Sequence, residues 1–279
     1  MKAFCWGQIG HRVVGGVAER HLDKKVLKRV KKIMKGKSLS DATTWADEMR
    51  SNPNYGELKK SHYTSIEDGG SYKAKRLDDI IGMIEKLIKA LKEEKNLDGY
   101  RNSILNNLSQ KDQLSLLAHF VGDLHQPLHV GRASDWGGNR IRVRWFDKES
   151  NLHKVWDEEV IEHMKLSFSE IVSFIDYSEK ANPGWIQGTP RELILKAMNE
   201  SFDLRATVYE FRNKYIERPV MMSEQEIFKK YPASLGNKKS KGSPVSLKWN
   251  YNYRAVPIVR KRLLQAGLRL AAILNAIYQ

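Results

Sequence analysis

The stretch His119-Phe120-Val121-Gly122-Asp123-Leu124-His125-Gln126-Pro127-Leu128-His129 contains three histidines and one aspartate in a short, otherwise largely apolar run. His119 and Asp123 are four residues apart on an expected helix, so their side chains project from one face and can bind the same metal ion. A second pair with this spacing, His153 and Asp157, follows at an expected helix start. One such pair is usually a salt-bridged helix face, but two pairs in one chain indicate a metal site assembled by a helical fold.

Further candidate ligands lie upstream of this stretch. His11 follows Trp6-Gly7-Gln8-Ile9-Gly10, Asp47 lies in Trp45-Ala46-Asp47-Glu48-Met49-Arg50, and His62 precedes Tyr63. Imidazole and carboxylate groups hold Zn²⁺ at neutral pH, and such a nitrogen and oxygen ligand set suits catalytic zinc. The single cysteine, Cys5, excludes an intrachain disulfide and a thiolate-rich structural zinc site.

The hydrophobic periodicity around these motifs is mostly helical. Apolar residues recur at three- and four-residue steps from Val13 to Met34, with Asp23 expected to separate two helices. The alternating segment Ile141–Phe146, after the turn signal Gly137-Gly138, predicts a hairpin. We expect a mainly α, single-domain fold with one small β-hairpin near residues 141–152. The other expected helices are Ser40–Met49, Leu77–Leu91, Gln113–Leu124, Glu192–Phe211 and Ala255–Ile277.

Length and composition agree with one domain. The chain has 279 residues, 41% of them hydrophobic, and a formal charge of +15, which attracts phosphate-rich polymers or anionic membrane surfaces. No apolar run reaches about 18 residues, so we expect no membrane insertion. Residues 1–5 look like the remnant of a targeting segment, which leaves 6–279 as the domain. Pro232–Pro244 reads as a solvated surface loop, with contact to a polyanion as the alternative.

Taken together, the motifs resemble the zinc-dependent single-strand-specific nuclease family of the S-one/P-one type, within the phospholipase C/nuclease superfamily. The match runs in order from Trp6 to about Asp157, and the remaining helices are compatible with it. The resemblance implies a helical fold of the phospholipase C/nuclease type that binds three zinc ions. The motifs are Trp6-x4-His11, Trp45-Ala46-Asp47-x2-Arg50, His62-Tyr63, the 119–129 stretch, Gly137-Gly138-Asn139 and Asn151-Leu152-His153-x3-Asp157.

The resemblance also implies a ligand set for each ion. Asp123 would bridge the first and second ions. The backbone of Trp6 would hold the second ion through its carbonyl and a free amine, which requires removal of residues 1–5. The first ion would be held by Asp47, His62, His119 and Asp123, the second by Trp6, His11 and Asp123, and the third by His129, His153 and Asp157.

The implied reaction is hydrolysis of single-stranded DNA and RNA to 5′-phosphorylated products, with 3′-nucleotidase activity as an additional possibility. A zinc-bound hydroxide would attack the phosphorus, and the third zinc would stabilise the departing oxygen. Asp47 is also a catalytic candidate through its zinc. Arg50 and Asn139 resemble the residues that contact phosphate in this family. For Arg50 the alternative is a salt bridge to a helix neighbour.

Base-binding candidates are aromatic, because unpaired bases stack on aromatic side chains. Tyr63 is the candidate platform, and Trp145 and Phe146 are assisting candidates whose alternative is core packing. Ser65 stands where fungal members carry a carboxylate that reads the base edge, so base preference is left open.

Other histidines and tryptophans receive structural interpretations. We interpret His125 as a buried hydrogen-bonding residue, and His21 and His163 as surface residues. The tryptophans interpreted as packing residues are Trp136, Trp156, Trp185 and Trp249. We expect a monomer without an obligate protein partner that acts on single-stranded DNA, RNA and nucleotides in a secreted or periplasmic location.

Two alternatives remain at this point. A zinc-dependent phospholipase C shares the trinuclear helical scaffold, although the short Trp6-x4-His11 spacing and Asp157 in place of glutamate argue against it. The second alternative is a non-catalytic protein whose helices are held together by zinc. It would bind nucleic acid in a salt-dependent manner without forming product.

Overall fold

The computed structural model describes residues 6–73, 78–178, 181–211, 222–231 and 244–279. The expected targeting remnant and nearly all of the expected 232–244 loop lie outside this range. The helices are α1 (Gln8–Arg20), α2 (Lys24–Ile33), α3 (Leu39–Ala42), α4 (Trp45–Met49), α5 (Ile80–Glu93), α6 (Ser103–Asn106), α7 (Gln110–Leu124), α8 (Leu152–Lys154), α9 (Val160–His163), α10 (Phe168–Ser178), α11 (Pro190–Val208), α12 (Glu224–Lys230) and α13 (Trp249–Tyr278). Short 3₁₀ segments are η1 (Pro53–His62), η2 (Pro127–His129) and η4 (Pro183–Trp185), and η3 (Val155–Glu159) is a π-helical turn.

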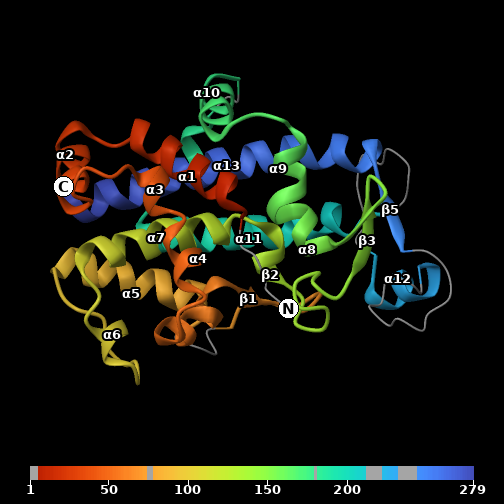
Figure 1. Cartoon of the computed structure of the whole chain (residues 1–279), viewed down its shortest axis with the longest axis horizontal. Helices are drawn as coiled ribbons and strands as arrows, with labels where there is room; N and C mark the ends of the chain where they lie inside the picture. Colours follow the sequence, from red (N-terminus) through yellow and green to blue (C-terminus); the bar gives the residue numbers. More distant parts are fainter. Residues whose placement is uncertain (1–5, 74–77, 179–180, 212–221, 232–243) are drawn as a thin grey trace.

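The core is a helical bundle with α7 at its centre. In Figure 1, α5, α7, α11 and α13 run along the long axis of the molecule. Every residue of α7 from Gln113 to Leu124 is buried, as expected for a helix surrounded by others. Helix α13 crosses α1 so closely that a Cβ on Gly267 would lie 2.4 Å from Cβ of Val17. The predicted ligands His119 and Asp123 are therefore carried by a helix that is buried along most of its length.

The expected helices are present, with shifted ends. Asp23 separates α1 from α2, as predicted. The single helix expected over Ser40–Met49 is instead two helices, α3 and α4, because the Thr43 and Thr44 hydroxyls donate to Ser40 O and Asp41 O at 2.9 and 3.1 Å. Helix α10 was not expected from the periodicity.

Two small sheets complete the fold. The predicted hairpin is confirmed: β3 (Arg142–Trp145) pairs antiparallel with β4 (Lys148–Asn151). Strand β5 (Val245–Leu247) pairs with β3 in parallel. This long-range pairing is not indicated by any local sequence pattern. Strands β1 (Thr64–Ser65) and β2 (Val130–Gly131) form a short parallel pair that places the end of η1 beside the end of the 119–129 stretch.

A buried ionic network anchors the end of α7. His125 donates from Nδ1 to Val121 O at 2.8 Å and accepts from Arg269 at Nε2 at 3.0 Å, and burial beside Arg262 and Arg269 holds its pKa well below the usual value. Glu200 accepts two 2.7 Å bonds from Arg269 and pairs with Arg262. His125 is thus the buried hydrogen-bonding residue that was predicted.

Among the helices of the described residues, none combines the length and the hydrophobicity that a membrane span requires.

Candidate metal centre

Eight of the predicted ligand side chains gather in three groups at one face of the bundle. Within each group the ligand atoms lie within 4.8 Å of one another. They come from α1, α4, α7 and α8 and from the short η1, η2 and η3 segments, so the site joins distant parts of the chain. The groups are His11, Asp47 and His119; His62, His119 and Asp123; and His129, His153 and Asp157.

Asp123 lies at the junction of the first two groups. Its Oδ1 is 3.3 Å from His11 Nε2, and its Oδ2 is 2.9 Å from His62 Nδ1 and 3.2 Å from His119 Nε2. Burial opposes ionisation of Asp123, but the charges of His119 and His129 hold its pKa well below the usual value. A carboxylate whose two oxygens face different imidazoles suits two neighbouring cations.

The third group takes Asp157 from the π-helical turn, His153 from α8 and His129 from η2. His153 Nε2 lies 3.1 Å from Asp157 Oδ2, and His129 Nε2 lies 3.7 Å from Asp157 Oδ1. Gln126 donates to Asp157 Oδ1 at 2.6 Å and thereby orients the carboxylate. Single π-turns inside helices are frequent at functional sites because they re-aim a side chain.

Backbone carbonyls fix the orientation of three imidazoles. Nδ1 of His119 donates to Thr43 O at 2.7 Å, Nδ1 of His129 to His62 O at 2.7 Å, and Nδ1 of His153 to Gly137 O at 2.6 Å. In each ring Nε2 is the nitrogen left to bind a metal. This arrangement, with the second ring nitrogen donating to a carbonyl, is typical of metal-ligating histidine.

Several buried atoms at the centre have no hydrogen-bond partner in the described chain. They include both ring nitrogens of His11, Oδ1 of Asp123, Nε2 of His129 and Oδ2 of Asp157. Buried polar groups are almost always paired, so a cluster of orphaned ligand atoms is the pattern expected where cations bind. The residues present therefore fit the implied zinc ions.

Protonation of the imidazoles is uneven. Burial disfavours a charge on both His119 and His62, yet Asp123 raises the pKa of His119 to about 9, whereas the pKa of His62 falls to about 4. The rings of His11 and His119 stack at 3.8 Å between centroids. Positive charge is thus favoured beside Asp123, a role that a divalent cation can take.

Trp6 and Gly7 hold the start of the described chain against the centre. The Trp6 indole donates to Gly122 O, and Gly7 N donates to Asp157 O, both at 2.8 Å. A Cβ on Gly122 would lie 3.0 Å from Nδ1 of His11, so the glycine of the 119–129 stretch makes room for that ring. Ligation by the Trp6 backbone stays a prediction, since residues 1–5 lie outside the described chain.

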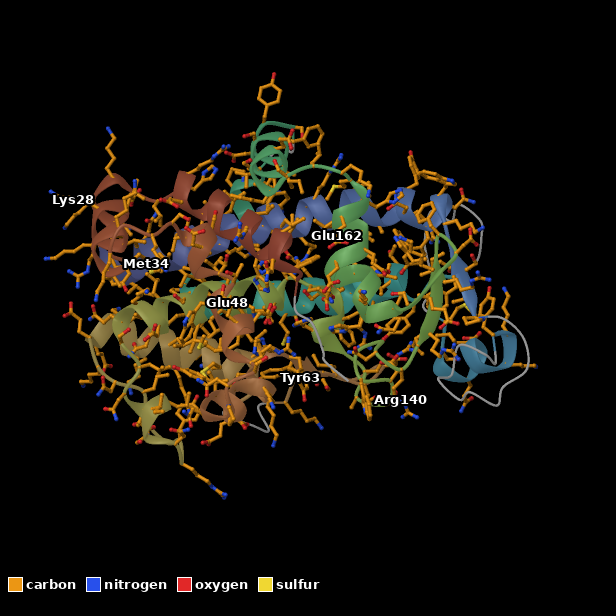
Figure 2. All side chains as sticks on the ribbon, in the orientation of Figure 1. Lys28, Met34, Glu48, Tyr63, Arg140 and Glu162 are labelled. Atoms are coloured by element: carbon orange, nitrogen blue, oxygen red, sulfur yellow. The ribbon has the colours of Figure 1, made fainter. Side chains whose placement is uncertain are left out.

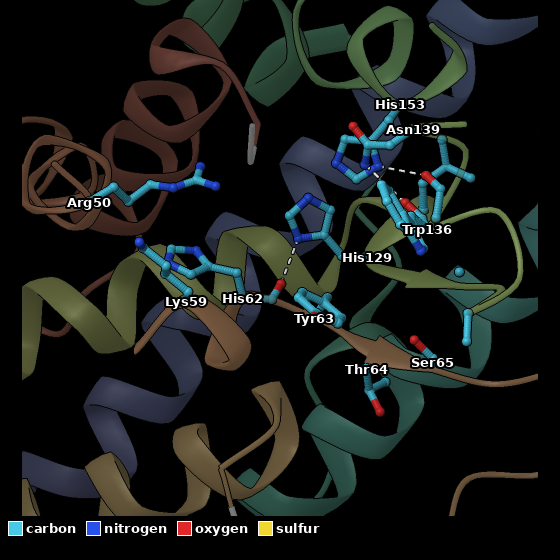
Figure 3. Close-up of a pocket in the computed structure, with 14 residues that line it drawn as sticks. Arg50, Lys59, His62, Tyr63, Thr64, Ser65, His129, Trp136, Asn139 and His153 are labelled. Carbon is cyan, nitrogen blue, oxygen red and sulfur yellow. Dashed lines mark hydrogen bonds between the residues drawn. The ribbon is translucent and has the colours of Figure 1, made fainter. Parts of the chain in front are cut away.

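A pocket of about 520 Å³ opens beside the second and third groups. Figure 3 shows Arg50 and Lys59 at one end, Trp136 and Asn139 at the other, and Tyr63 between them. The other lining residues are His62, Thr64, Ser65, Leu128, His129, Gly131, Ala133, Gly137 and His153.

The predicted phosphate- and base-contacting residues divide between this pocket and another region. Arg50, Asn139, Tyr63 and Ser65 line the pocket. Arg50 also donates to Asp47 Oδ1 at 3.1 Å, so the salt bridge proposed as its alternative role is present as well. Tyr63, which directly precedes β1, and Ser65 of β1 are both exposed, whereas Thr64 between them is buried, in keeping with the alternation of an extended backbone.

Trp145 and Phe146 do not line the pocket. Trp145 is only 6% exposed and belongs to the core, which agrees with the alternative given for the hairpin aromatics. Phe146 stacks on the half-buried His163 at 4.4 Å and contacts Trp249 at 4.8 Å. Their role in binding a base stays a prediction, but both side chains pack against His163 and neither lines the pocket. His163 is accordingly not a free surface histidine, whereas His21 is exposed and contacts Asp176.

Two pocket residues were missed by sequence reasoning. They are Trp136 and Lys59. Trp136, expected to be a packing residue, lines the pocket and is 58% exposed. Trp249, also expected to pack, is not among the lining residues but is 67% exposed. Trp136 stands at φ +56° in a turn whose Gly138 N donates to Asp135 Oδ1 at 2.8 Å. Its position just before the Gly137-Gly138 signal was the available clue. Lys59 had no sequence signal.

A mainly helical fold with three neighbouring His and Asp groups that could hold metal ions, two of them reaching a pocket, is the arrangement expected of a metal-dependent hydrolase. More narrowly, the chain belongs to the S1/P1 nuclease family, because the family model described as S1/P1 Nuclease matches residues 6–279. The protein is accordingly an endonuclease.

Individual relatives agree with this assignment. The chain is 28% identical to Endonuclease 3 of Arabidopsis thaliana over 291 residues, covering 99% of this chain and 90% of that protein. Endonuclease 4 of the same plant is 29% identical over 99% of this chain and 90% of its own length. Nuclease S1 of Aspergillus oryzae is 27% identical over 60% of this chain and 58% of its own length.

Proposed function

We propose that the protein hydrolyses phosphodiester bonds of single-stranded DNA and RNA at a centre of three zinc ions. The observation that carries this proposal is that His62 of the second group and His129 and His153 of the third line the same pocket as Arg50. His119 has only Nε2 left for a metal, so it serves one ion, together with Asp47, His62 and Asp123. His11, Trp6 and Asp123 would then hold the second ion, and His129, His153 and Asp157 would hold the third.

When bound, zinc supplies Lewis acidity, which activates water toward hydrolysis and offsets charge on phosphate oxygens. The chain's own residues orient the phosphodiester. The Arg50 guanidinium, held by Asp47, presents charge to a phosphate in the pocket, and Asn139 donates from the opposite end. Such positioned donors contribute about 3 to 4 kcal/mol to transition-state stabilisation.

Selectivity for unpaired strands follows from the aromatic groups of the pocket. Tyr63 is 43% exposed and Trp136 is 58% exposed, so both rings offer a face to a base. Stacking contributes about 1 to 3 kcal/mol per base, and a base in a duplex is already stacked. Ser65, which lines the pocket together with Tyr63, contacts the base edge as a hydroxyl in place of a carboxylate.

The remaining features of the proposal follow the family. Products carry a 5′-phosphate, 3′-mononucleotides are additional substrates, and the enzyme is a monomeric single domain over 6–279 without an obligate protein partner. It acts outside the cytoplasm after removal of residues 1–5, which frees the amine of Trp6.

The test is cleavage of a labelled single-stranded oligonucleotide with identification of product ends, combined with zinc analysis of the same preparation. Three zinc ions per chain and 5′-phosphorylated products are expected. Release of diacylglycerol from liposomes without nucleotide products would favour the phospholipase alternative, and salt-dependent binding without product would favour the non-catalytic one.

A further inference from the structure

Helix α2 carries the densest positive charge of the described chain. Residues 24–37 contain eight lysines and arginines and no acidic residue. Val26 and Val30 are buried, and the opposite side of the helix is exposed. The exposed lysines of this segment are Lys24, Lys25, Lys28, Lys31, Lys32, Lys35 and Lys37. We call this set the lysine face.

The lysine face is not compensated by neighbouring acids. Arg29 pairs with Glu94 and lies over the ring of Tyr278, but none of the seven lysines forms an ion pair with a residue of the described chain. By contrast, α5 mixes signs on its surface, with Glu85 and Glu93 among its lysines.

This charge pattern costs stability. Lys24, Lys28 and Lys31 follow one another at helical steps of four and three residues, where like charges repel by about 0.2 to 0.5 kcal/mol per pair. Lys24 also stands at the positive end of the helix dipole, where acidic residues are favoured, and the N-cap residue Asp23 is the one acid there, with none in the first turn. A helix that only had to cover the core would gain from interspersed carboxylates, so this surface is better suited to an external anion.

The lysine face lies away from the pocket. Figure 2 shows Lys28 near one end of the molecule, and Tyr63 of the pocket near its middle. Helix α2 contains no aromatic residue, so it offers bases no stacking surface. Lysine ammonium groups at helical spacing suit the phosphates of a backbone, whether or not its bases are paired.

We propose that the lysine face is a second, non-catalytic contact for the sugar-phosphate backbone of long nucleic acid, base-paired segments included. The inference rests on the proposed function, since it makes the face a docking surface for substrates whose single-stranded part is cut in the pocket. Long or partly duplex substrates would use the face, and dinucleotides would not reach it.

The experiment compares two charge-matched variants of the holoenzyme. One carries Lys24→Gln, Lys28→Gln, Lys31→Gln and Lys32→Gln, and the other carries Lys89→Gln, Lys92→Gln, Lys165→Gln and Lys229→Gln on other exposed surfaces. Binding of a fluorescent phosphorothioate DNA duplex with a single-stranded tail, which resists cleavage, is measured by anisotropy across a salt series. Cleavage of a dinucleotide is measured in parallel.

The α2 variant should bind about tenfold or more weakly at 0.1 M salt, and its slope of log affinity against log salt should shrink by about 3. The second variant should keep a slope close to the parent, and both should cleave the dinucleotide like the parent. Equal losses in the two variants would show a general charge effect and overturn the proposal. The proposal would also be overturned if the α2 variant lost binding to phosphatidylserine vesicles but bound DNA like the parent.

Folding and function are separable in this design. Because repulsion is relieved, the melting temperature of the α2 variant should equal or exceed that of the parent, and the pair Lys28→Gln and Lys31→Gln should reduce the slope by about half as much. Absence of dinucleotide cleavage in all versions would refute the proposed function, while the difference in slope would still decide the role of the lysine face.

Discussion

The imidazole of His129 donates a hydrogen bond from Nδ1 to the backbone carbonyl of His62, at 2.7 Å. His62 belongs to the group around Asp123, and His129 belongs to the group around Asp157. The bond therefore couples two candidate ion sites directly, and the parallel pairing of Thr64 with Val130 reinforces it. A substitution in one ion site should therefore also affect metal binding at the other.

Replacing Asp123 with asparagine should lower cleavage more than about a hundredfold, because we propose that the residue serves two ion sites, and direct ligands matter more than their supporting groups. Elemental analysis after dialysis should show loss of at least one zinc ion per chain. His21→Ala, on the surface beside Asp176, is the control and should retain both zinc and activity. An Asp123→Asn protein with full zinc content and parental turnover would contradict the ligand assignment.

Removing the metal should lower the melting temperature as well as abolish cleavage. Cations that bind the folded state stabilise it by about 2.7 kcal/mol when present at a hundred times their dissociation constant. Scanning calorimetry with and without chelator, followed by addition of Zn²⁺, measures this effect. Superimposable unfolding curves would mean that the buried His and Asp groups do not hold ions.

Tyr63→Ala and Trp136→Ala should each raise the KM for an oligonucleotide by roughly tenfold, which corresponds to the lower end of one lost base stack. A small phosphodiester without a nucleobase should be hydrolysed as in the parent. Trp145→Ala is the informative control, since this core residue should lower the melting temperature instead. Equal KM changes for both substrates would argue against stacking.

Arg50→Ala should reduce kcat by about a hundredfold or more, the usual cost of removing one transition-state donor. Arg50→Lys should recover part of the rate, because it retains the charge but not the planar donor geometry. If Arg50→Ala lowers the melting temperature but leaves kcat unchanged, the only role of Arg50 is structural, through its salt bridge to Asp47.

Glu200→Gln should make stability less dependent on pH in the acidic range. Burial by itself raises the pKa of Glu200, but the bonds from Arg269 and the charges of Arg262 and Arg269 lower it below its usual value of 4.5. A lowered pKa in the folded state means that the ionised carboxylate stabilises above about pH 4.5, and that this stabilisation is lost as pH falls through the folded-state pKa. Urea unfolding should show a deficit of about 2 kcal/mol or more in Glu200→Gln at pH 7, shrinking toward pH 3. A constant deficit across that range would be inconsistent with this ion pair.

The 119–129 stretch shows how much of the site local sequence can reveal. Four-residue spacing on a helix is a local geometric fact, so the pairing of His119 with Asp123 and of His153 with Asp157 could be predicted. The hairpin near 141–152 and the mainly helical fold were likewise encoded in short-range periodicity.

Relations across the chain were decided only by the tertiary structure. Trp145 and Trp136 are both tryptophans near the hairpin, yet Trp145 is buried against Phe146 and His163, whereas Trp136, in the turn before Gly137, is exposed and lines the pocket. The position of Lys59 beside Arg50 in the pocket likewise depends on packing between segments. The sequence by itself determined which residues could bind metal and which segments are helical, because both follow from side-chain chemistry and helical spacing. Which aromatic and cationic groups face the substrate was decided by long-range contacts, since burial depends on what the rest of the chain places on top of a residue.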